Sequence, residues 1–398
     1  MPSLSRPEWS LVLTLAAINF THLVDFVIVM PLGNRLMTEL DITPQQYGRI
    51  VSAYGIAAAL AGVAFAAIAD RFDRKQSLLG VYAGLIVATL ACGLARGYLE
   101  MIVARLAAGA FGGVAASSLM AIVGDRFEDQ RRGTATGVVM AAFALASVVG
   151  LPIGIMLANR FGRGAPFLAI AALSVPVWIM ALFVLPPVNA HMTQSPKPAA
   201  VRLWHAAKDP GHLRAFAFMF FLVLGTFTII PFLVPYLEAN AGRHPDDIPT
   251  IYFMAGFVTL VSTVAIGRLT DRWGKMPIFL GVAVGSIVMT LVLTNLPEVS
   301  YPTAAIVTTL FMVLSSGRVV PAQALMQAAA EPASRGAFTN LNSAISNCGI
   351  GLAPFLGSLF LGRDADNRMT GYPIAGLLAA TFALIAIILA FRVRRPSS

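Results

Sequence analysis

Apolar residues gather in long blocks that recur along the whole chain of 398 residues. Each block holds about 20 residues, which is the length that an α-helix needs to cross the hydrocarbon core of a membrane. Twelve blocks can be drawn, at residues 9–33, 44–69, 76–95, 98–123, 134–158, 166–186, 214–237, 249–270, 277–296, 302–327, 336–361 and 372–392. The pattern predicts an all-α integral membrane protein with twelve transmembrane helices.

The composition supports a membrane protein. Hydrophobic residues make up 57% of the chain and charged residues only 12%, whereas soluble domains carry about 25% charged residues. So few polar groups cannot cover a globular surface, which excludes a soluble enzyme and a disordered protein. An outer-membrane barrel would show short alternating segments instead. Cys92 and Cys348 both lie inside apolar blocks and provide neither a disulfide framework nor a metal site.

Lys and Arg residues in short loops indicate the orientation, because such loops stay on the cytoplasmic side. With a cytoplasmic N-terminus, most of the 28 Lys and Arg residues, including every Lys, fall on that side. We therefore expect a multi-pass protein of a prokaryotic inner membrane with both termini in the cytoplasm. The net charge of +9 reflects this loop bias. Since the basic residues are scattered over many loops, no nucleic-acid partner is predicted.

A long polar connection at residues 187–213 divides the blocks into six and six. The division predicts an N-terminal bundle at 1–186, a cytoplasmic linker at 187–213 and a C-terminal bundle at 214–398. The loop AAIADRFDRK at 66–75 is echoed by GRLTDRWGK at 267–275, and residues 128–133 are echoed by 331–336, both about 200 residues later. The chain is therefore expected to be a duplicated unit that forms two pseudo-symmetric six-helix bundles.

Twelve spans, a long central loop and an Asp-Arg loop motif in both halves resemble the major facilitator superfamily over the whole chain. Further motifs resemble its bacterial drug:proton antiporters and sugar-efflux proteins of the arabinose efflux permease type. These motifs are Asp25 ahead of Pro31, Arg105-x-x-x-Gly109, and the sequence GLPIG at 150–154. The resemblance implies transport by alternating access of the two bundles.

Three positions depart from the family pattern. Ala66 and Asp73 stand where the first loop motif usually has glycine, and Leu151 separates Gly150 from Pro152, where the antiporter pattern has Gly-Pro directly.

Few ionisable residues lie well inside an apolar block. They are His22 and Asp25 in the first, Arg105 in the fourth and Arg318 in the tenth. An isolated charge at the membrane centre costs about 3 kcal/mol by insertion scales, so such a group usually faces a cavity or a partner. Asn19, His22 and Asp25 recur every three residues and share one side of a helix. We expect this side to line the central cavity.

Several roles remain open for these groups. Asp25 is suited to load and release a proton, or it forms a fixed polar tie between helices. His22 is a second proton site or a neutral imidazole bonded to a neighbouring helix. By resemblance, Arg105 couples protonation of the cavity acid to substrate binding, and the alternative is a structural ion pair with Asp25 or Glu100. Arg318 is a gate contact or a snorkelling side chain.

The loop motifs predict a latch between the halves. Asp70 and Asp271 stand at cytoplasmic helix ends, where a carboxylate can bind the N-terminus of a helix from the opposite half. By resemblance, Arg74 pairs with Asp125 at the end of the fourth span. The remaining gating residues are Arg71, Arg132, Arg272, Lys275 and Arg335.

Two further sets of residues complete the predicted site. Glycine and proline permit close helix packing or a kink at Gly109, Gly113, Gly150, Pro152 and Gly154. Polar groups for a substrate are expected from Asn19, Ser117, Thr226, Thr228, Thr308, Asn340 and Asn347. Each of these polar residues can instead form only an interhelical hydrogen bond.

The sequence lacks a Walker phosphate-binding loop, so a gradient must drive any transport. We predict a monomeric transporter, not an enzyme, that needs no cofactor or metal and whose partners are a small-molecule substrate, protons and the lipid bilayer. It is expected to export a drug-like amphipathic molecule, a sugar or a related metabolite by proton antiport. The alternative is a facilitator or proton symporter for a sugar, an amino acid or another small metabolite. A transport-dead receptor is a rival of another class.

Overall fold

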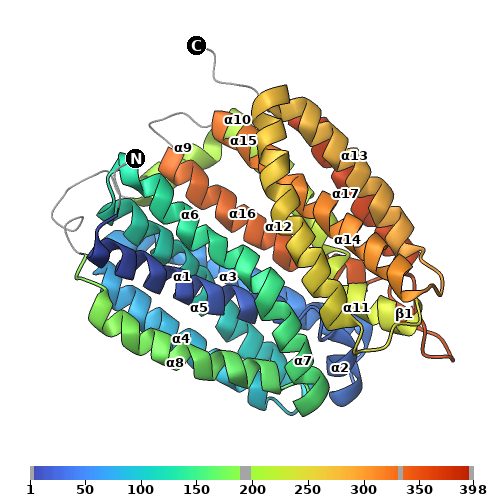
Figure 1. Cartoon of the computed structure of the whole chain (residues 1–398). Helices are drawn as coiled ribbons and strands as arrows, with labels where there is room; N and C mark the ends of the chain where they lie inside the picture. The colour runs from blue at the N-terminus through green and yellow to red at the C-terminus, as the bar shows by residue number, and fades with distance from the viewer. Residues whose placement is uncertain (1–3, 189–198, 330–334, 394–398) are drawn as a thin grey trace.

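The computed structural model describes residues 4–188, 199–329 and 335–393. We call residues 4–188 the N-half and residues 199–393 the C-half. Figure 1 shows the two halves side by side, with helix α2, helix α11 and the strand β1 at one end of the molecule and both chain ends near the other. The first end is called the hairpin side and the second the terminal side.

The N-half is helical throughout. Its elements are α1 Arg6–Ile28, α2 Gly33–Glu39, α3 Pro44–Ile68, the 3-10 turn η1 Ala69–Arg71, α4 Arg74–Leu94, α5 Tyr98–Arg126, α6 Asp129–Leu145, the π-helical turn η2 Ala146–Gly150, α7 Leu151–Phe161 and α8 Ala165–Val184.

The C-half repeats this pattern and adds a short hairpin that the sequence did not predict. Its elements are α9 Ala199–Lys208, α10 Pro210–Phe227, α11 Ile230–Ala239, α12 Ile248–Trp273, α13 Lys275–Thr294, α14 Tyr301–Gly317, α15 Val319–Ala329, α16 Arg335–Ser358, the antiparallel strands β1 Gly362–Arg363 and β2 Met369–Thr370, and α17 Tyr372–Ala390. Part of the predicted linker, residues 189–198, lies outside the described residues.

Helix starts follow local sequence signals. The Ser5 backbone N–H donates to the Glu8 carboxylate at 2.8 Å at the start of α1, and the Thr43 hydroxyl accepts from the Gln46 N–H before α3. Asp209 accepts from the N–H groups of Gly211 and His212 before α10. These backbone hydrogen bonds lower the pKa of the Asp209 carboxyl group, because they favour its charged form.

Eleven helical segments of the described chain are long and apolar enough to cross a membrane. They account for every predicted span except the eleventh, which corresponds to the 24-residue helix α16. This helix carries Thr339, Asn340, Asn342, Ser343, Ser346 and Asn347, which lower its hydropathy. It packs on α3 of the N-half and on α10. Asn342, Ser346 and Asn347 are half-buried, whereas Thr339, Asn340 and Ser343 are exposed. The arrangement is consistent with twelve helices.

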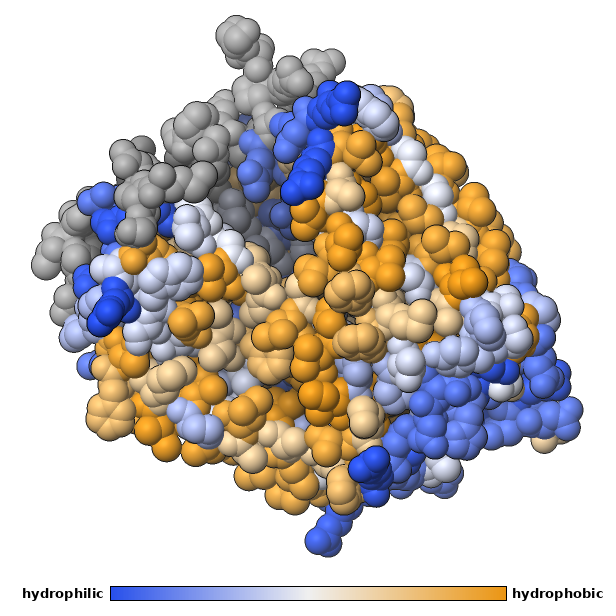
Figure 2. Space-filling view, in the orientation of Figure 1, coloured by the Kyte–Doolittle hydropathy of each residue, from blue (hydrophilic) through white to orange (hydrophobic). Residues whose placement is uncertain are grey.

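The outer surface is apolar where lipid would contact it. Figure 2 shows hydrophobic residues over the flanks of both halves and hydrophilic residues gathered on the hairpin side. Large apolar side chains such as Leu60, Leu99 and Phe183 are among the most exposed in the molecule. A soluble monomer rarely exposes apolar patches of this extent, and a bilayer would cover them.

Three predicted spans are interrupted by residues outside any helix, and the fifth passes through the π-helical turn η2. The first ends at Ile28, three residues before Pro31. The seventh breaks at Thr228 and Ile229, just before Pro231, and the tenth breaks at Arg318. Proline explains the first two interruptions, because it cannot donate to the helical hydrogen-bond ladder.

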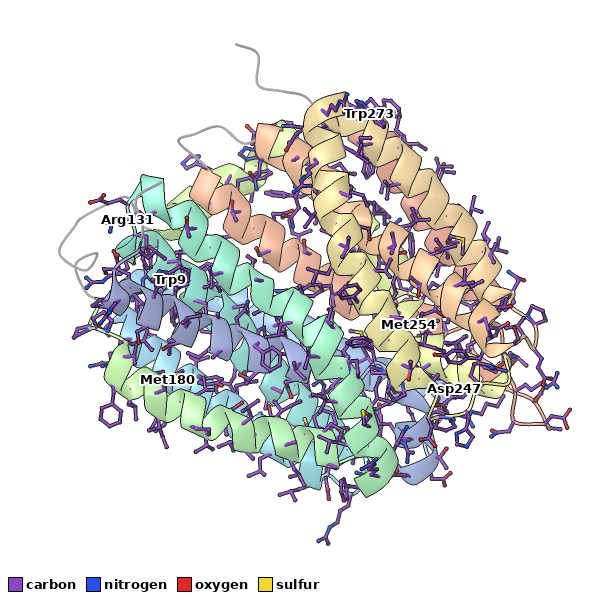
Figure 3. All side chains as sticks on the ribbon, in the orientation of Figure 1. Trp9, Arg131, Met180, Asp247, Met254 and Trp273 are labelled. Atoms are coloured by element: carbon purple, nitrogen blue, oxygen red, sulfur yellow. The ribbon has the colours of Figure 1, made fainter. Side chains whose placement is uncertain are left out.

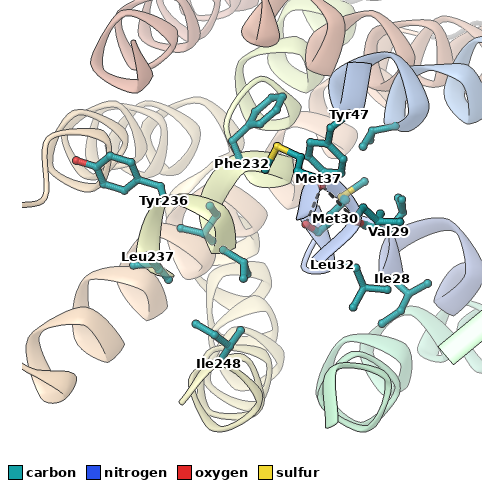
Figure 4. Packing of buried hydrophobic residues seen from close by; sticks show 14 of the residues in the cluster. Ile28, Val29, Met30, Leu32, Met37, Tyr47, Phe232, Tyr236, Leu237 and Ile248 are labelled. Carbon is teal, nitrogen blue, oxygen red and sulfur yellow. Dashed lines mark hydrogen bonds between the residues drawn. The ribbon is translucent and has the colours of Figure 1, made fainter. Parts of the chain in front are cut away.

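Three hydrophobic cores show how the halves are joined. The largest combines residues of both halves on the hairpin side, among them Met30, Tyr47, Phe232 and Tyr372. Figure 4 shows Tyr47 and Met37 from the N-half against Phe232 from the C-half. A second core lies within the N-half and a third within the C-half. The halves therefore share a core on the hairpin side, while each keeps its own core toward the terminal side.

Helices α3 and α16 cross closely because glycines meet at the crossing. A Cβ atom added at Gly55 would lie 2.5 Å from the Gly351 Cα, and one added at Gly351 would lie 2.5 Å from the Ile56 nitrogen. Small residues of this kind let transmembrane helices approach until their backbones touch. This crossing ties the two halves together, because α3 and α16 form the most extensive helix–helix contact in the described structure.

We expect Gly55→Ala to destabilise the protein by about 1–3 kcal/mol, because the new methyl group overpacks a backbone contact. Thermal unfolding in detergent measures the effect. Gly80→Ala is the matched control, because a Cβ at Gly80 of α4 meets nothing within 4 Å. Equal melting temperatures for the two variants would contradict the close crossing.

Candidate functional site

A buried ion pair joins α1 to α5 in the N-half. The Arg105 Nη1 lies 3.7 Å from the Asp25 Oδ2, and the two side chains are 0% and 1% exposed. The Thr89 side chain lies beside the carboxylate, but neither carboxylate oxygen accepts a hydrogen bond of normal geometry from the described residues. The acid is thus held by charge attraction without a hydrogen-bond cage.

Arg105 also closes the end of α1. Its Nη1 donates to the Asp25 carbonyl at 3.0 Å and its Nη2 to the Phe26 carbonyl at 3.2 Å. The last four carbonyls of a helix have no partner within the helix, and they carry the negative end of its dipole. Arg105 therefore has a fixed position that does not depend on the charge of the Asp25 side chain.

Tyr54 of α3 lies between Arg105 and His22. The Arg105 Cζ is 4.4 Å from the centroid of the Tyr54 ring, and the Tyr54 hydroxyl lies 3.1 Å from the His22 Nδ1. The Phe26 ring packs on Tyr54 with centroids 5.1 Å apart. Sequence reasoning missed Tyr54. The available signal was its spacing of seven residues from Tyr47, which places two polar-tipped aromatic residues on one side of α3.

Glycines of α5 make room for Tyr54. A Cβ added at Gly109 would overlap the Tyr54 backbone, and one at Gly112 would overlap the Tyr54 hydroxyl. A Cβ at Gly113 would overlap the Ala58 backbone of the same helix α3. Arg105 and Gly109 are therefore one helical turn apart on α5. Arg105 contacts the Tyr54 ring, and Gly109 leaves room for the Tyr54 backbone.

The GLPIG motif packs against the same helix α1 from another side. A Cβ at Gly150 would lie 2.5 Å from the Val24 side chain, and one at Gly154 would overlap Ile28. Pro152 lies in the first turn of α7, directly after the π-helical turn. A π-turn holds one residue more than an α-turn, which accommodates the additional Leu151. An apolar cavity of about 140 Å³ lies beside Val24 and these glycines.

The predicted substrate-contacting residues do not converge on one open cavity in this conformation. The Asn19 amide is buried and donates to the Val139 carbonyl of α6 at 2.9 Å, so it ties two helices rather than facing a cavity. The Thr228 hydroxyl donates to the Leu224 carbonyl of its own helix, and the Ser117 hydroxyl to the Val114 carbonyl. The remaining residues differ in exposure: Thr308 is fully buried, Thr226 and Asn347 are half-buried, and Asn340 is exposed.

Arg318 is a buried cation with neutral partners. Its guanidinium donates to the hydroxyls of Ser286 at 3.0 Å and Thr226 at 2.5 Å, and to the Leu222 carbonyl at 3.2 Å. The side chain is 3% exposed, so it does not snorkel into lipid. It links α13 and α10 to the break between α14 and α15.

The latch residues of the N-half form contacts within that half. The expected pair between Arg74 and Asp125 is present, with the Arg74 Nε 3.1 Å from the Asp125 Oδ2. Asp73, the departure from the family's glycine, accepts from the Gln76 N–H at the start of α4 and from the Val188 N–H after α8. Arg132 donates to two carbonyls at the end of α5.

In the C-half, the Lys275 Nζ donates to the Ala324 carbonyl at 3.1 Å. Arg71, Asp271 and Arg272 are exposed. The side chains of Asp70 and Arg335 lie outside the described residues. The contacts described for Arg74, Asp125, Arg132 and Lys275 each join residues of the same half.

The hairpin side carries polar contacts between the halves instead. The Asn34 Nδ2 donates to the Glu238 Oε2, and the Arg363 Nη2 donates to the Asn34 Oδ1, both at 2.7 Å. The Tyr47 hydroxyl donates to the Pro231 carbonyl at 3.0 Å, and the Asn159 Nδ2 donates to a carbonyl after α11. Partial burial lowers the pKa of the Arg363 guanidinium, and the nearby Glu238 charge opposes that shift. We call Asn34, Glu238 and Arg363 the clamp.

We expect Arg105→Gln to lower the free energy of unfolding by about 3–5 kcal/mol, because it leaves a buried carboxylate without its partner. Asp25→Asn in the same protein should recover part of this loss, since it removes the unpaired charge. Thermal unfolding of both single variants and the double variant in detergent measures the coupling. Strictly additive losses would contradict an energetically important pair.

The fold and the sequence match known proteins. The pattern of the Major Facilitator Superfamily matches residues 15–312 and 215–398. The chain is 23% identical over 380 residues to the uncharacterised MFS-type transporter YbcL of Bacillus subtilis, covering 95% of this chain and 94% of that one. It is 23% identical over 257 residues to the putative transporter AraJ of Escherichia coli, covering 63% and 62% of the two chains.

Solved structures share the fold. A bacterial homologue of the human lysosomal transporter Spinster, in an inward-facing and occupied conformation, superposes with a TM-score of 0.77 at 15% identity, covering 98% of this chain and 97% of that chain. A D-xylose–proton symporter gives a TM-score of 0.77 at 14% identity, covering 95% and 97%. With the duplicated bundles, the loop motifs and the family match over both halves, the chain belongs to the major facilitator superfamily, and it is a membrane-spanning transporter.

Proposed function

We propose that this transporter exports a small organic solute in exchange for protons. The observation that carries the proposal is the Asp25–Arg105 pair. The carboxylate is buried in a transmembrane bundle, 3.7 Å from its cation, and accepts no hydrogen bond of normal geometry from the residues that the structure describes. Two opposing effects act on such a group: apolar surroundings favour its neutral form, and the arginine favours its charged form. A solute or a water molecule that changes the polarity around Asp25, or its contact with Arg105, therefore changes the protonation of Asp25.

The position of Arg105 suits reversible protonation. Because its guanidinium is also bonded to the Asp25 and Phe26 carbonyls, it has partners whether Asp25 is charged or neutral. A fixed ion pair would instead show charge-assisted hydrogen bonds at about 2.7–2.9 Å. The longer separation between Asp25 and Arg105 favours an exchangeable proton over a purely structural tie.

The joined and separate cores support alternating access. On the hairpin side the halves share one core and the clamp, whereas toward the terminal side each half has its own core. We assign the terminal side to the cytoplasm because Lys and Arg concentrate in its loops. Figure 3 shows Trp9, Arg131 and Trp273 toward this side and Asp247 toward the other. If the membrane is a prokaryotic inner membrane, the hairpin side faces outward, and the shared core and the clamp close the protein on that side.

We propose a neutral or cationic amphipathic solute, or a sugar, as the substrate. Phe26 of α1 and Phe227 of α10 face each other across the halves with centroids 6.3 Å apart, and they offer apolar and cation-attracting faces. A facilitator or proton symporter for a small metabolite is the alternative, and the likeness of the fold to a D-xylose–proton symporter favours it. In either case we propose a monomer that needs no cofactor.

The proton exchange can be measured directly. Inside-out vesicles are energised and challenged with lipophilic cations, sugars and amino acids, and proton release is followed by a pH-sensitive dye. We expect a solute-triggered release in the wild type and its loss in Asp25→Asn. Glu298→Gln, at an exposed acid outside the spans, should keep it. Counterflow of labelled solute in both wild type and Asp25→Asn, without any pH change, would instead establish a facilitator.

The clamp generates a separate prediction. Asn34→Ala removes one hydrogen bond to Glu238 and one from Arg363, and bonds to charged groups contribute about 1.5–3 kcal/mol. We expect amide hydrogen exchange in α2 and in the β1–β2 hairpin to become about tenfold faster or more. Asn295→Ala is the matched control, because its amide bonds only within its own helix end, mainly to the Leu291 carbonyl. Unchanged exchange in Asn34→Ala would show that the clamp does not hold this side closed.

A further inference from the structure

Tyr54 contacts both candidate proton sites at once. Its ring carries the Arg105 guanidinium on one face, and its hydroxyl meets the His22 Nδ1. Arg105 in turn lies against the Asp25 carboxylate. A continuous series of contacts therefore runs from Asp25 through Arg105 and Tyr54 to His22, across helices α1, α5 and α3.

The ring of Tyr54 supplies a contact that the guanidinium otherwise lacks. The Arg105 Nε is buried and donates no hydrogen bond to the described residues. Arg105 is held by the Asp25 carboxylate, by two helix-end carbonyls and by the aromatic face of Tyr54. A desolvated guanidinium over an aromatic ring is attracted by the negative charge of its face. The charge of Arg105, and any anion that offsets this charge, therefore acts on the electrostatic environment of the phenol.

The hydroxyl of Tyr54 has a restricted choice of partners. It is enclosed by Gly112, where a Cβ would overlap it, and by the His22 ring. The Tyr54 O–H donates to an unprotonated Nδ1, or its oxygen accepts from a protonated one, so the bond depends on the state of the imidazole. A cation over the ring makes the phenol a better donor, which favours the unprotonated Nδ1.

Four ionisable groups of the described chain surround Tyr54. The ionisable groups that interact with it are Asp25 and His22 of α1, Arg105 of α5 and Cys92 of α4. From the C-half, α16 brings Gly351 and the Asn347 carbonyl against the neighbouring Gly55, and neither group titrates.

We infer that Tyr54 is a positioning residue that couples the charge of Asp25 to the hydrogen bonding and protonation of His22. When Asp25 takes up a proton, Arg105 loses its anionic partner and its charge acts more fully on the Tyr54 ring. The Tyr54 hydroxyl then donates more strongly to the His22 Nδ1. The inference rests on the proposed proton coupling, and it makes the two sites one unit.

Nitrogen NMR of the purified protein tests the coupling without transport. The chain has 5 histidines, and the ¹⁵N signals of His22 are assigned by their loss in His22→Gln. We expect Asp25→Asn to shift the His22 signals in the wild-type background and to leave them unshifted in Tyr54→Phe, which keeps the ring and loses the hydroxyl. Tyr82→Phe is the matched control, because it removes a buried hydroxyl bonded to Thr21, and Asp25→Asn should still shift His22 there.

Two results would overturn the inference. One is an equal shift of the His22 signals by Asp25→Asn in the wild-type and Tyr54→Phe backgrounds, and the other is no shift in either. Tyr54→Phe is expected to fold like Tyr82→Phe, and equal melting temperatures of the two variants check this.

A transport measurement separates this inference from the proposed function. In proteoliposomes, Tyr54→Phe should move the midpoint of the pH profile of solute-driven proton flux by about half a unit or more. The same substitution in a His22→Gln background should move it no further, because Tyr54 acts through His22. An equal movement in both backgrounds would overturn the coupling. Absence of proton flux in the wild type, together with the expected NMR result, would refute antiport and leave the coupling of the two residues standing.

Discussion

The burial of Arg105 is the constraint on which the rest of the N-half depends. A permanently charged guanidinium inside a transmembrane bundle must find several partners at once. The last turn of α1 provides two carbonyls and the Asp25 carboxylate, and α3 provides the face of Tyr54. This arrangement requires α3 to lie close to α5, and the glycines of α5 stand at the points of closest approach. The capping of the last turn of α1, the crossing of α3 and α5, and the surroundings of Tyr54 are all tied to this one buried charge.

The C-half uses the same architecture without this chemistry. The repeat offset places Thr308 where the N-half has Arg105, and Thr308 is a fully buried residue whose hydroxyl finds no partner among the described residues. The buried cation of the C-half is Arg318, which lies ten residues after Thr308 along the chain. Its guanidinium donates to two hydroxyls and a carbonyl. The duplicated halves have thus diverged: one carries the acid and its arginine, and the other carries a cation held by neutral groups.

The closest connections between the halves lie on one side of the molecule. Glycine contacts between α3 and α16, a shared apolar core and the clamp all lie from the middle of the molecule toward the hairpin side. The clamp is built from three polar residues, so it can be broken at a lower cost than a dry apolar seam, because water can replace its hydrogen bonds.

The sequence by itself determined the number of spans, the duplication and the family, because the length and apolarity of a span and the repeat of a motif are local properties of the chain. It also indicated Asp25, His22 and Arg105 as the charges that need partners, since a charge in an apolar block is visible without a structure. Helix starts at Ser5, Thr43 and Asp209 could be read from capping residues in the same way.

Only the tertiary structure decided which partners those charges have. Tyr54 lies 32 residues from His22 along the chain, and Asn34 meets Arg363 across 329 residues, so no local pattern announces either contact. Asn19 was expected in the cavity but is bonded to α6, because a helical face can be turned toward a cavity or toward a neighbour by small rotations that leave the sequence pattern unchanged. Hydrophobic length is summed along one helix, whereas hydrogen bonds and ion pairs depend on ångström-scale distances between helices, and these are fixed only when all the helices pack together.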